Sequence, residues 1–319
     1  MARIAVLDDY QRVAQRFADW SLLSAHEVTF FHEPLGEPDA VARTLEPFDV
    51  VCAMRERTAF PAELFARLPN LRLLVTTGMR NAAVDMDAAA RHGVTVTGTS
   101  VPGLSTAELT WGLILALVRR IPVEDRGMRE GGWQTTVGID LHGRTLGIVG
   151  LGRLGSAVAR VGVAFGMRLV AWSQNLTAER AAEWGAALVT KDELFEAADV
   201  VTIHLVLSGR TRGLVGAREL GLMKPTAFLV NTSRGPIVDE GALLAALESG
   251  SIAGAALDVY DREPLPADHP LRRAPNTVLT PHLGYVTEET YRAFYEQTVE
   301  DVEGFLAGTP VRVIVSPSS

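Results

Sequence analysis

The stretch GLGRLG at residues 150–155 decides the fold of this 319-residue chain. It follows the apolar run TLGIV and precedes the helix-like run SAVARVGVAF. In a G-x-G-x-x-G turn, Gly150 permits the tight turn, Gly152 lets the backbone approach a pyrophosphate, and Gly155 lets the following helix pack on the strand. Because another strand-like run follows at residues 168–173, the pattern predicts a strand, turn and helix that bind a dinucleotide. A glycine-rich turn without a ligand is the alternative.

This fingerprint lies near the middle of the chain, within a series of apolar strand-like runs. The runs TLGIVG, RLVAWS, ALVT, VVTIHL, AFLVNTS, AALDVY and TVLT are rich in Val, Ile and Leu, as parallel strands covered on both faces are. An earlier α/β series begins with RIAVLDD, which ends in Asp8 and Asp9 instead of glycines. We therefore expect an α/β protein in which a doubly wound parallel sheet is inserted into a second α/β domain.

The C-terminal segment predicts how the two domains are connected. After TPHLG come a helix capped by Thr287 and the strand-like run PVRVIV, which have little left to cover in the second domain. The simplest topology returns them to the first domain. We expect a discontinuous first domain at residues 1–99 and 286–319, and a dinucleotide-binding domain at residues 100–285.

Composition narrows the possible partners and the compartment. The formal net charge is -8, so no basic face is available for a phosphate backbone, and we expect neither nucleic acid nor a membrane surface as partner. The longest apolar run, LTWGLILALV, has about half the length needed to cross a bilayer. Cys52 is the only cysteine and the N-terminus MARIAVLDDY lacks a signal-peptide core, so we expect a cytoplasmic protein. The sequence contains no cluster typical of metal ligands, and no metal is expected.

The end of the second strand bears on the choice of cofactor. An NAD enzyme carries Asp or Glu about 20 residues after the fingerprint, where it binds the ribose 2′-hydroxyl. Here Ser173, Gln174 and Asn175 stand at that point, so no carboxylate repels a 2′-phosphate. Ser173 and Asn175 can donate hydrogen bonds to one, although Arg180 is the nearest arginine on the distal side. The pattern favours NADP over NAD and leaves both open.

Three polar residues follow successive strand-like runs of the second domain. Arg234 follows AFLVNTS, Glu263 follows AALDVY, and His282 follows TVLT. Ligands of doubly wound sheets bind at the carboxyl edge of the strands, so these residues can converge on one site. Each also has a structural explanation, as a loop arginine, a turn-capping acid or a hydrogen-bonded histidine.

The segments VNTSRGPIVDEGAL, ALDVYDREPLPADHPL and TPHLG resemble the signatures of the D-isomer-specific 2-hydroxyacid dehydrogenases. This family includes phosphoglycerate dehydrogenase and the glyoxylate and hydroxypyruvate reductases, and the resemblance spans residues 50–285. It implies a Rossmann-type doubly wound sheet inserted into a flavodoxin-like α/β substrate-binding domain, and a homodimer built largely on the nucleotide domain. It also implies hydride transfer between a nicotinamide cofactor and a small 2-keto or D-2-hydroxy acid.

The resemblance assigns roles that the chemistry supports. Hydride transfer to a carbonyl carbon leaves negative charge on oxygen, so the site needs a proton donor and a fixed cation. The expected general acid and base is His282, with Glu263 favouring the imidazolium and fixing its orientation. Arg234 is expected to fork onto the substrate carboxylate and carbonyl. The formate-oxidising branch has glutamine at the Glu263 position, so this chain resembles the hydroxyacid enzymes.

Further contacts are implied by the same resemblance. Asp258 is expected to accept a hydrogen bond from the nicotinamide carboxamide, with a structural acid at the strand end as the alternative. His204 lies beside the cofactor in the family fold, but a buried structural histidine is equally consistent with the sequence, and we leave it out of the catalytic set. The remaining expected cofactor contacts are Arg153, Leu154, Thr232, Ser233 and Gly284.

In the first domain, the runs MRERT and TTGMRN resemble the substrate side of the family. The expected substrate contacts there are Arg55, Gly78, Met79 and Arg80. Most relatives have a second small or aromatic residue where this chain has Met79, Arg80 and Asn81. An Arg80 that faces the substrate would favour a second anionic group on it, and a solvated loop arginine is the alternative.

A different class of protein uses the same fold and the same three polar residues. Dinucleotide-sensing transcriptional corepressors bind partner peptides and usually carry disordered extensions, which we do not expect here because a strand-like run lies near each end of the sequence. We therefore expect an enzyme, with the corepressor-like binding module as the alternative. The sequence leaves open which 2-hydroxy acid is used and the physiological direction.

Overall fold

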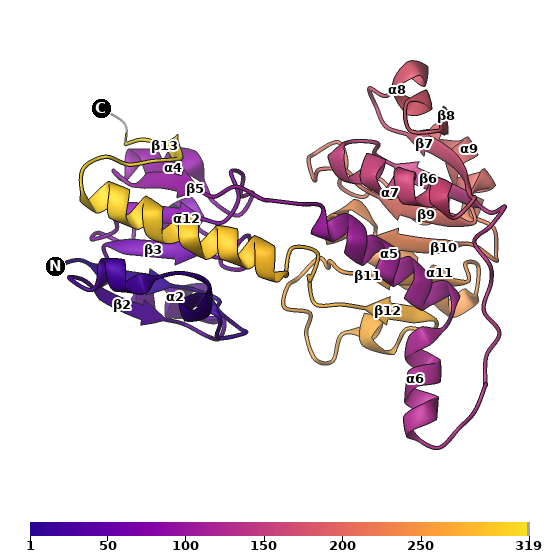
Figure 1. Ribbon diagram of the computed structural model, residues 1–319, viewed down its shortest axis with the longest axis horizontal. Helices are drawn as coiled ribbons and strands as arrows, with labels where there is room; N and C mark the ends of the chain where they lie inside the picture. The colour runs from indigo at the N-terminus through magenta and orange to yellow at the C-terminus, as the bar shows by residue number, and fades with distance from the viewer. Residues whose placement is uncertain (318–319) are drawn as a thin grey trace. The chain divides into compact units, whose positions relative to one another are not determined.

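Two sheets, each made mainly of parallel strands, form the cores of two units of the chain (Figure 1). The computed structural model describes residues 1–317. Unit 1 comprises Met1–Gly103 and the chain from Thr287 onward, and unit 2 comprises Leu104–Val286. One continuous segment therefore separates the two parts of unit 1.

The sheet of unit 1 has the strand order β13-β5-β4-β3-β1-β2. The strands β1 to β5 are parallel, and β13 pairs antiparallel with β5 at one edge. The order 2-1-3-4-5 of the parallel strands is that of flavodoxin-like sheets. The strands are β1 (Arg3–Val6), β2 (Glu27–Phe30), β3 (Val50–Ala53), β4 (Leu73–Thr76), β5 (Thr95–Gly98) and β13 (Val313–Val315).

Short helices and one long helix cover this sheet. The long helix α12 (Glu288–Leu306) begins at Thr287, whose hydroxyl accepts a hydrogen bond from the Thr290 amide, and it packs against α1 and β4. Arg312 Nε donates to the buried Asp301 carboxylate at 2.8 Å, which ties the segment before β13 to α12. The other helices are α1 (Ala14–Phe17), η1 (Trp20–Leu23), α2 (Pro38–Leu45), α3 (Ala62–Phe65) and α4 (Met86–Arg91).

The sheet of unit 2 is parallel throughout, in the order β12-β11-β10-β9-β6-β7-β8. The chain starts in the middle at β6, runs to one edge, and then crosses back to β9, so the order reverses between β6 and β9. Such a reversal is the point at which open α/β sheets bind ligands. The strands are β6 (Thr145–Val149), β7 (Arg168–Trp172), β8 (Ala186–Leu188), β9 (Val200–Ile203), β10 (Phe228–Asn231), β11 (Gly254–Leu257) and β12 (Thr277–Leu279).

Helices pack on both faces of this second sheet. The helices α5 (Ser105–Val118) and α7 (Arg153–Ala164) bury one face, and α9 (Lys191–Ala197), α10 (Ala217–Leu222) and α11 (Glu240–Ser249) bury the other. The predicted α/β fold with a Rossmann-type doubly wound parallel sheet is thereby confirmed. The remaining elements are α6 (Ile121–Arg129), α8 (Ala178–Ala182), η2 (Gly235–Ile237) and η3 (Pro270–Arg273). Among residues 1–317, no helix combines the length and apolar character needed to span a membrane.

Candidate active site

The glycine turn joins β6 to α7 and has the geometry that a dinucleotide requires. Gly150 has a φ of 101°, and a Cβ built there would lie 2.7 Å from the His204 carbonyl oxygen. A Cβ on Gly155 would collide with the Gly150 carbonyl. At Gly152, in contrast, nothing lies within 4 Å of a built Cβ. Two glycines are therefore demanded by close packing, and the one between them opens onto free space at the start of a helix.

The residues around this open space fit a nicotinamide dinucleotide. Helix α7 has 12 residues, and the first N–H groups of a helix point to a ligand at its N-terminus. Its first turn carries Arg153, which is exposed, and Leu154, which is half-buried. At the end of β7, Ser173 is half-buried while Gln174 and Asn175 are exposed. None of these five side chains is acidic, so they leave room for phosphate groups without like-charge repulsion.

Hydrogen bonds within the sheet edge hold the loop that carries Arg234. Asn231, the last residue of β10, donates from Nδ2 to the Arg234 carbonyl at 3.0 Å and accepts at Oδ1 from the Ser233 amide at 3.0 Å. Ser233 Oγ donates to the Ile203 carbonyl at 2.7 Å, which links the loop to the end of β9. The half-buried Arg234 donates from Nη1 to the Ser233 carbonyl at 2.8 Å. The arginine therefore extends from a braced loop.

His282 and Glu263 come from the loops that follow β12 and β11, and the structure brings them into contact. The atoms His282 Nδ1 and Glu263 Oε2 lie 2.5 Å apart, with 21% and 33% of the two side chains exposed. The other carboxylate oxygen, Oε1, accepts from the Tyr260 amide at 2.9 Å. Because a carboxylate can only accept, the shared hydrogen belongs to Nδ1, and Nε2 remains as the nitrogen able to exchange a proton. This is the arrangement that a general acid and base needs.

Asp258 fastens the loop on which His282 lies. Its carboxylate is completely buried and accepts from the Thr280 hydroxyl at 2.6 Å, the Leu283 amide at 2.7 Å and the Gly284 amide at 2.9 Å. Burial raises the pKa of Asp258, and these hydrogen bonds oppose the rise. These hydrogen bonds on both sides of His282 could not be predicted from the sequence. Direct contact between Asp258 and a cofactor stays a prediction.

His204, at the end of β9, has a structural setting. Thr202 Oγ1 and His204 Nε2 lie 2.9 Å apart, and Nδ1 is buried without a hydrogen-bond partner within residues 1–317. Burial lowers the pKa of His204 to about 4, so the ring is neutral near neutral pH. A neutral imidazole with one nitrogen on a threonine is consistent with its exclusion from the catalytic set.

In unit 1, the predicted substrate-side residues Arg55 and Gly78 lie together. Arg55 Nη1 donates to the Thr77 carbonyl at 2.9 Å, and the guanidinium covers Gly78 so closely that a Cβ there would collide with it. Asn81, which the sequence did not assign, braces the loop by donating to the Arg55 carbonyl at 2.7 Å and the Thr76 hydroxyl at 2.8 Å. Two further predicted contacts are exposed, Met79 and Arg80. The substrate roles of all four stay predictions.

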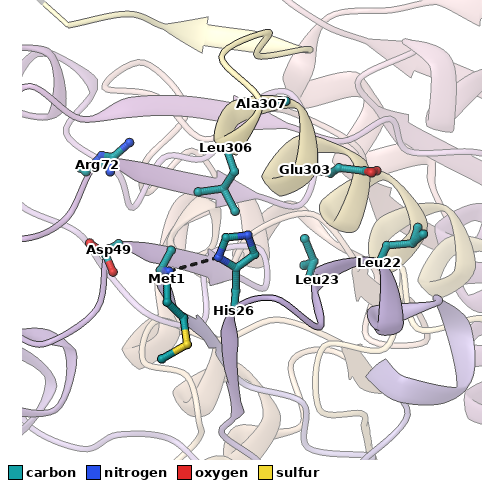
Figure 2. A pocket seen from close by; sticks show the side chains of 10 residues that line it. Met1, Leu22, Leu23, His26, Asp49, Arg72, Glu303, Leu306 and Ala307 are labelled. Carbon is teal, nitrogen blue, oxygen red and sulfur yellow. Dashed lines mark hydrogen bonds between the residues drawn. The ribbon is translucent and has the colours of Figure 1, made fainter.

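A hollow of about 420 Å³ lies elsewhere in unit 1 and contains none of the predicted site residues (Figure 2). It lies where β1, β3 and β4 begin, whereas ligands of open α/β sheets bind where the strands end. Its polar groups hold the start of β1, since Asp49 accepts from the Arg3 amide at 2.7 Å and His26 Nδ1 accepts from the Ala2 amide at 3.1 Å. The hollow is therefore accounted for structurally. Elsewhere too, the described residues contain no group of three or more His, Cys, Asp or Glu placed to hold a metal ion.

Comparisons with known proteins agree with this geometry. A family model described as "D-isomer specific 2-hydroxyacid dehydrogenase, NAD binding domain" matches residues 111–284, which lie within unit 2. A glyoxylate reductase of Aeropyrum pernix is 42% identical over 258 residues, covering 77% of this chain and 76% of the relative. A D-3-phosphoglycerate dehydrogenase of Bacillus subtilis is 40% identical over 84% of this chain, which spans 51% of that longer protein. The crystal structure of a phosphoglycerate oxidoreductase from Vibrio cholerae is 38% identical, with a TM-score of 0.92 over 97% of this chain and all of that one.

Proposed function

Because the chain belongs to the D-isomer-specific 2-hydroxyacid dehydrogenase family, we propose that it reduces a small 2-keto acid of the glyoxylate or hydroxypyruvate type to the D-2-hydroxy acid. It is an oxidoreductase of that family, with a nicotinamide-binding domain in unit 2. The observation that carries the proposal is the contact of 2.5 Å between His282 and Glu263. It lies at the carboxyl edge of the sheet that also bears the glycine turn and the Arg234 loop.

The proposed roles follow from the chemistry of each side chain. The bound nicotinamide supplies the hydride in reduction and accepts it in oxidation. His282 delivers a proton from Nε2 to the carbonyl oxygen, where negative charge develops. Glu263 holds the ring by its Nδ1 hydrogen and balances the charge of the imidazolium. Arg234 binds the substrate carboxylate and carbonyl through its planar donors.

Of the two nicotinamide cofactors, NADP is the one that we propose the enzyme prefers over NAD. Its support is the absence of an acidic side chain at Ser173, Gln174 and Asn175, where an acid would repel a 2′-phosphate. Beyond the glycines and these three residues, the proposed cofactor contacts are Arg153, Leu154, Thr232, Ser233, Asp258 and Gly284.

Unit 1 is proposed as the substrate-binding domain. The support is the construction of its Arg55 loop, in which a guanidinium fixed by the Thr77 carbonyl covers Gly78. A half-buried guanidinium held in place beside a glycine suits a carboxylate ligand. Met79 and Arg80 complete the proposed set of substrate contacts, and an inward-facing Arg80 would extend the substrate class to acids with a second anionic group.

A homodimer is proposed on the basis of exposed apolar residues in unit 2. Helix α6 and the loop after it stand away from the sheet (Figure 1), and no residue of this fully described helix is buried. Large apolar patches at a surface mark interaction sites, and a second copy of the chain is the proposed occupant. The exposed apolar residues are Ile121, Val123, Met128, Trp133 and Val137. The net charge of -8 supports the further proposal that nucleic acid is no partner. A cytoplasmic location is proposed because Cys52, the single cysteine of the sequence, is buried and free.

Steady-state kinetics test the proposed activity. Oxidation of NADPH and of NADH is followed with glyoxylate, hydroxypyruvate, pyruvate and bulkier keto acids. His282→Ala is expected to lower kcat by roughly a thousandfold, while His92→Ala, an exposed histidine of unit 1, leaves it unchanged. Tight cofactor binding without turnover of any keto acid would contradict the enzyme and favour the dinucleotide-sensing module.

A further inference from the structure

We propose that helix α5 sets the position of the Arg234 loop relative to the His282 loop, and that Thr110 is the positioning residue that acts on the first of them. The inference rests on the proposed function for the roles of Arg234 and His282. It concerns contacts that lie wholly within unit 2.

Two threonines on one face of α5 hold the two loops. Thr106 Oγ1 donates to the Gly284 carbonyl at 2.9 Å, and Gly284 lies two residues after His282. Thr110 Oγ1 lies 2.8 Å from Thr232 Oγ1, and Thr232 lies two residues before Arg234. Residues four apart on a helix project from the same face, one turn apart. A single rigid turn of helix therefore spaces the attachment points of both loops.

The hydrogens of these hydroxyls can be assigned by counting. Thr110 Oγ1 also lies 2.7 Å from the Thr106 carbonyl, one turn earlier, and a carbonyl can only accept. A threonine hydroxyl has one hydrogen. The Thr110 hydroxyl donates it to the Thr106 carbonyl and must therefore accept from the Thr232 hydroxyl. The Thr232 hydroxyl is thus a donor aimed at the helix, which fixes its rotamer. Both side chains are buried, with relative exposures of 0% for Thr110 and 6% for Thr232.

Loss of the Thr110 hydroxyl has a specific consequence for the Arg234 loop. Valine has nearly the shape of threonine, so the helix packing is kept, but the buried Thr232 donor loses its acceptor. A buried donor without a partner is costly enough to make the side chain turn toward another acceptor. The displacement arises at Thr232, two residues from Arg234. The contact between His282 and Glu263 and the hydrogen bonds from the His282 loop to Asp258 are untouched.

The crowding around Gly284 shows how tightly the helix and the second loop are registered. A Cβ built on Gly284 would lie 3.1 Å from Thr106 Oγ1 and 3.2 Å from Asp258 Oδ2. The loop backbone is thus clamped between the helix and the carboxylate that fastens the His282 loop. Movement of α5 at this end would be transmitted to that loop directly.

The test compares Thr110→Val, Thr110→Ser and a control, Thr298→Val, which makes the same change at a buried helical threonine of unit 1. We expect Thr110→Val to raise the KM for the keto acid about tenfold and to weaken cofactor binding, measured by fluorescence titration, by about threefold to tenfold. Thr110→Ser should keep the KM and the cofactor affinity near those of the wild type, because serine keeps the hydroxyl. The pH dependence of kcat stays that of the wild type, because the contact between His282 and Glu263 is kept.

Thr232→Val provides the second arm. If the two hydroxyls act as one pair, the effect of Thr110→Val on cofactor affinity is largely absent in a Thr232→Val background. Two outcomes would overturn the inference. One is that the effects of Thr110→Val and Thr232→Val simply add. The other is that Thr110→Val and Thr298→Val show the same KM and cofactor affinity at a similar loss of Tm. A wild-type protein that binds cofactor but reduces no keto acid would refute the proposed function, and the cofactor titrations would still decide the role of Thr110.

Discussion

Nδ1 of His282 lies 2.5 Å from one carboxylate oxygen of Glu263, and the other oxygen of Glu263 is held by the Tyr260 amide. Both oxygens of the carboxylate are thus held, so it cannot rotate away from the ring without losing the hydrogen bond from the Tyr260 amide. The imidazole in turn presents Nε2 in one orientation. Fixed orientation of a proton donor is a large part of what general acid catalysis requires.

Glu263→Gln is expected to lower kcat about a hundredfold with little change in KM. Glutamine keeps an acceptor for only one of the two donors, His282 Nδ1 and the Tyr260 amide, and carries no charge to balance the imidazolium. The matched control is Glu240→Gln, because Glu240 pairs with His269 Nε2 at 2.9 Å outside the candidate site. Steady-state kinetics of the two variants decide the matter, and equal effects would remove the special role of Glu263.

Arg234→Lys is expected to raise the KM for the keto acid and to lower kcat, with a combined loss in kcat/KM of about a thousandfold. Lysine keeps the charge but cannot bind carboxylate and carbonyl with planar paired donors. Cofactor affinity, measured by fluorescence titration, should change little. Arg218→Lys serves as the control, since Arg218 pairs with Asp192 at the surface. An Arg234→Lys enzyme with normal kcat/KM would exclude the proposed substrate contact.

Ser173→Asp is expected to lower kcat/KM with NADPH by about a hundredfold and to leave the value with NADH within a few-fold. The introduced carboxylate repels a 2′-phosphate and can accept from a 2′-hydroxyl. Ser24→Asp places the same charge on an exposed serine of unit 1 and should change neither value. A wild-type enzyme that already prefers NADH strongly would contradict the proposed preference for NADP.

Asp301 is expected to make stability fall as the pH rises through the acid range. Burial raises its pKa from 3.8 to about 6, although Arg312 opposes the rise. Between about pH 4 and pH 6 the folded state therefore keeps a proton that the unfolded chain has lost, so the free energy of unfolding decreases with pH. Asp301→Asn does not titrate, so relative to it the wild type should lose on the order of 2 kcal/mol across this window.

Urea denaturation at several pH values between about 4 and 7 measures this difference. The control is Asp39→Asn, since the hydrogen bond from the exposed Arg67 lowers the pKa of Asp39. There the wild type should gain stability relative to the variant as the pH rises, which is the opposite sign. A pH-independent difference between wild type and Asp301→Asn would refute the assignment.

Trp133→Glu is expected to convert a dimer into monomers in sedimentation or light-scattering measurements. Trp133 is 73% exposed in the loop after α6, and a charge placed in a buried apolar interface is strongly unfavourable. Val206→Glu is the control, because Val206 is 76% exposed elsewhere in unit 2. A wild-type protein that is monomeric at all concentrations would remove the proposed dimer.

The features that could be predicted from the sequence are those that depend on short stretches of the chain. The glycine turn could be recognised because its glycines meet local constraints: Gly150 has a φ of 101°, and a Cβ on Gly155 would collide with the Gly150 carbonyl. Arg234, Glu263 and His282 were found because each lies within three residues of the end of a strand-like run, and parallel strands end at a common edge. Helix α6 was not predicted, and none of its residues is buried in the structure, so it lacks the buried apolar face by which the other long helices are recognised.

Contacts between distant elements left no comparable signal. The hydroxyls of Thr110 and Thr232 meet across 122 residues, and nothing near either one encodes the other. The sequence predicts Asp258 as a cofactor contact, with a structural acid at the strand end as the alternative, but it gives no sign of the hydrogen bonds that Asp258 accepts from Thr280 and two backbone amides of the His282 loop. Such roles depend on which loops the fold brings together, and they become visible only once the strand order is known.

The antiparallel strand β13 and the helix α12 also govern when unit 1 can be completed during synthesis. Both emerge from the ribosome after the whole of unit 2, although they pair with and cover strands made at the beginning. Until then the nascent amino-terminal half exposes the edge of β5 and the apolar surface later buried beneath Tyr291, Phe294 and Val299. Unit 1, whose synthesis starts first, is therefore the last to complete its fold. Until α12 and β13 have been made, its exposed apolar surface is one that a chaperone would bind.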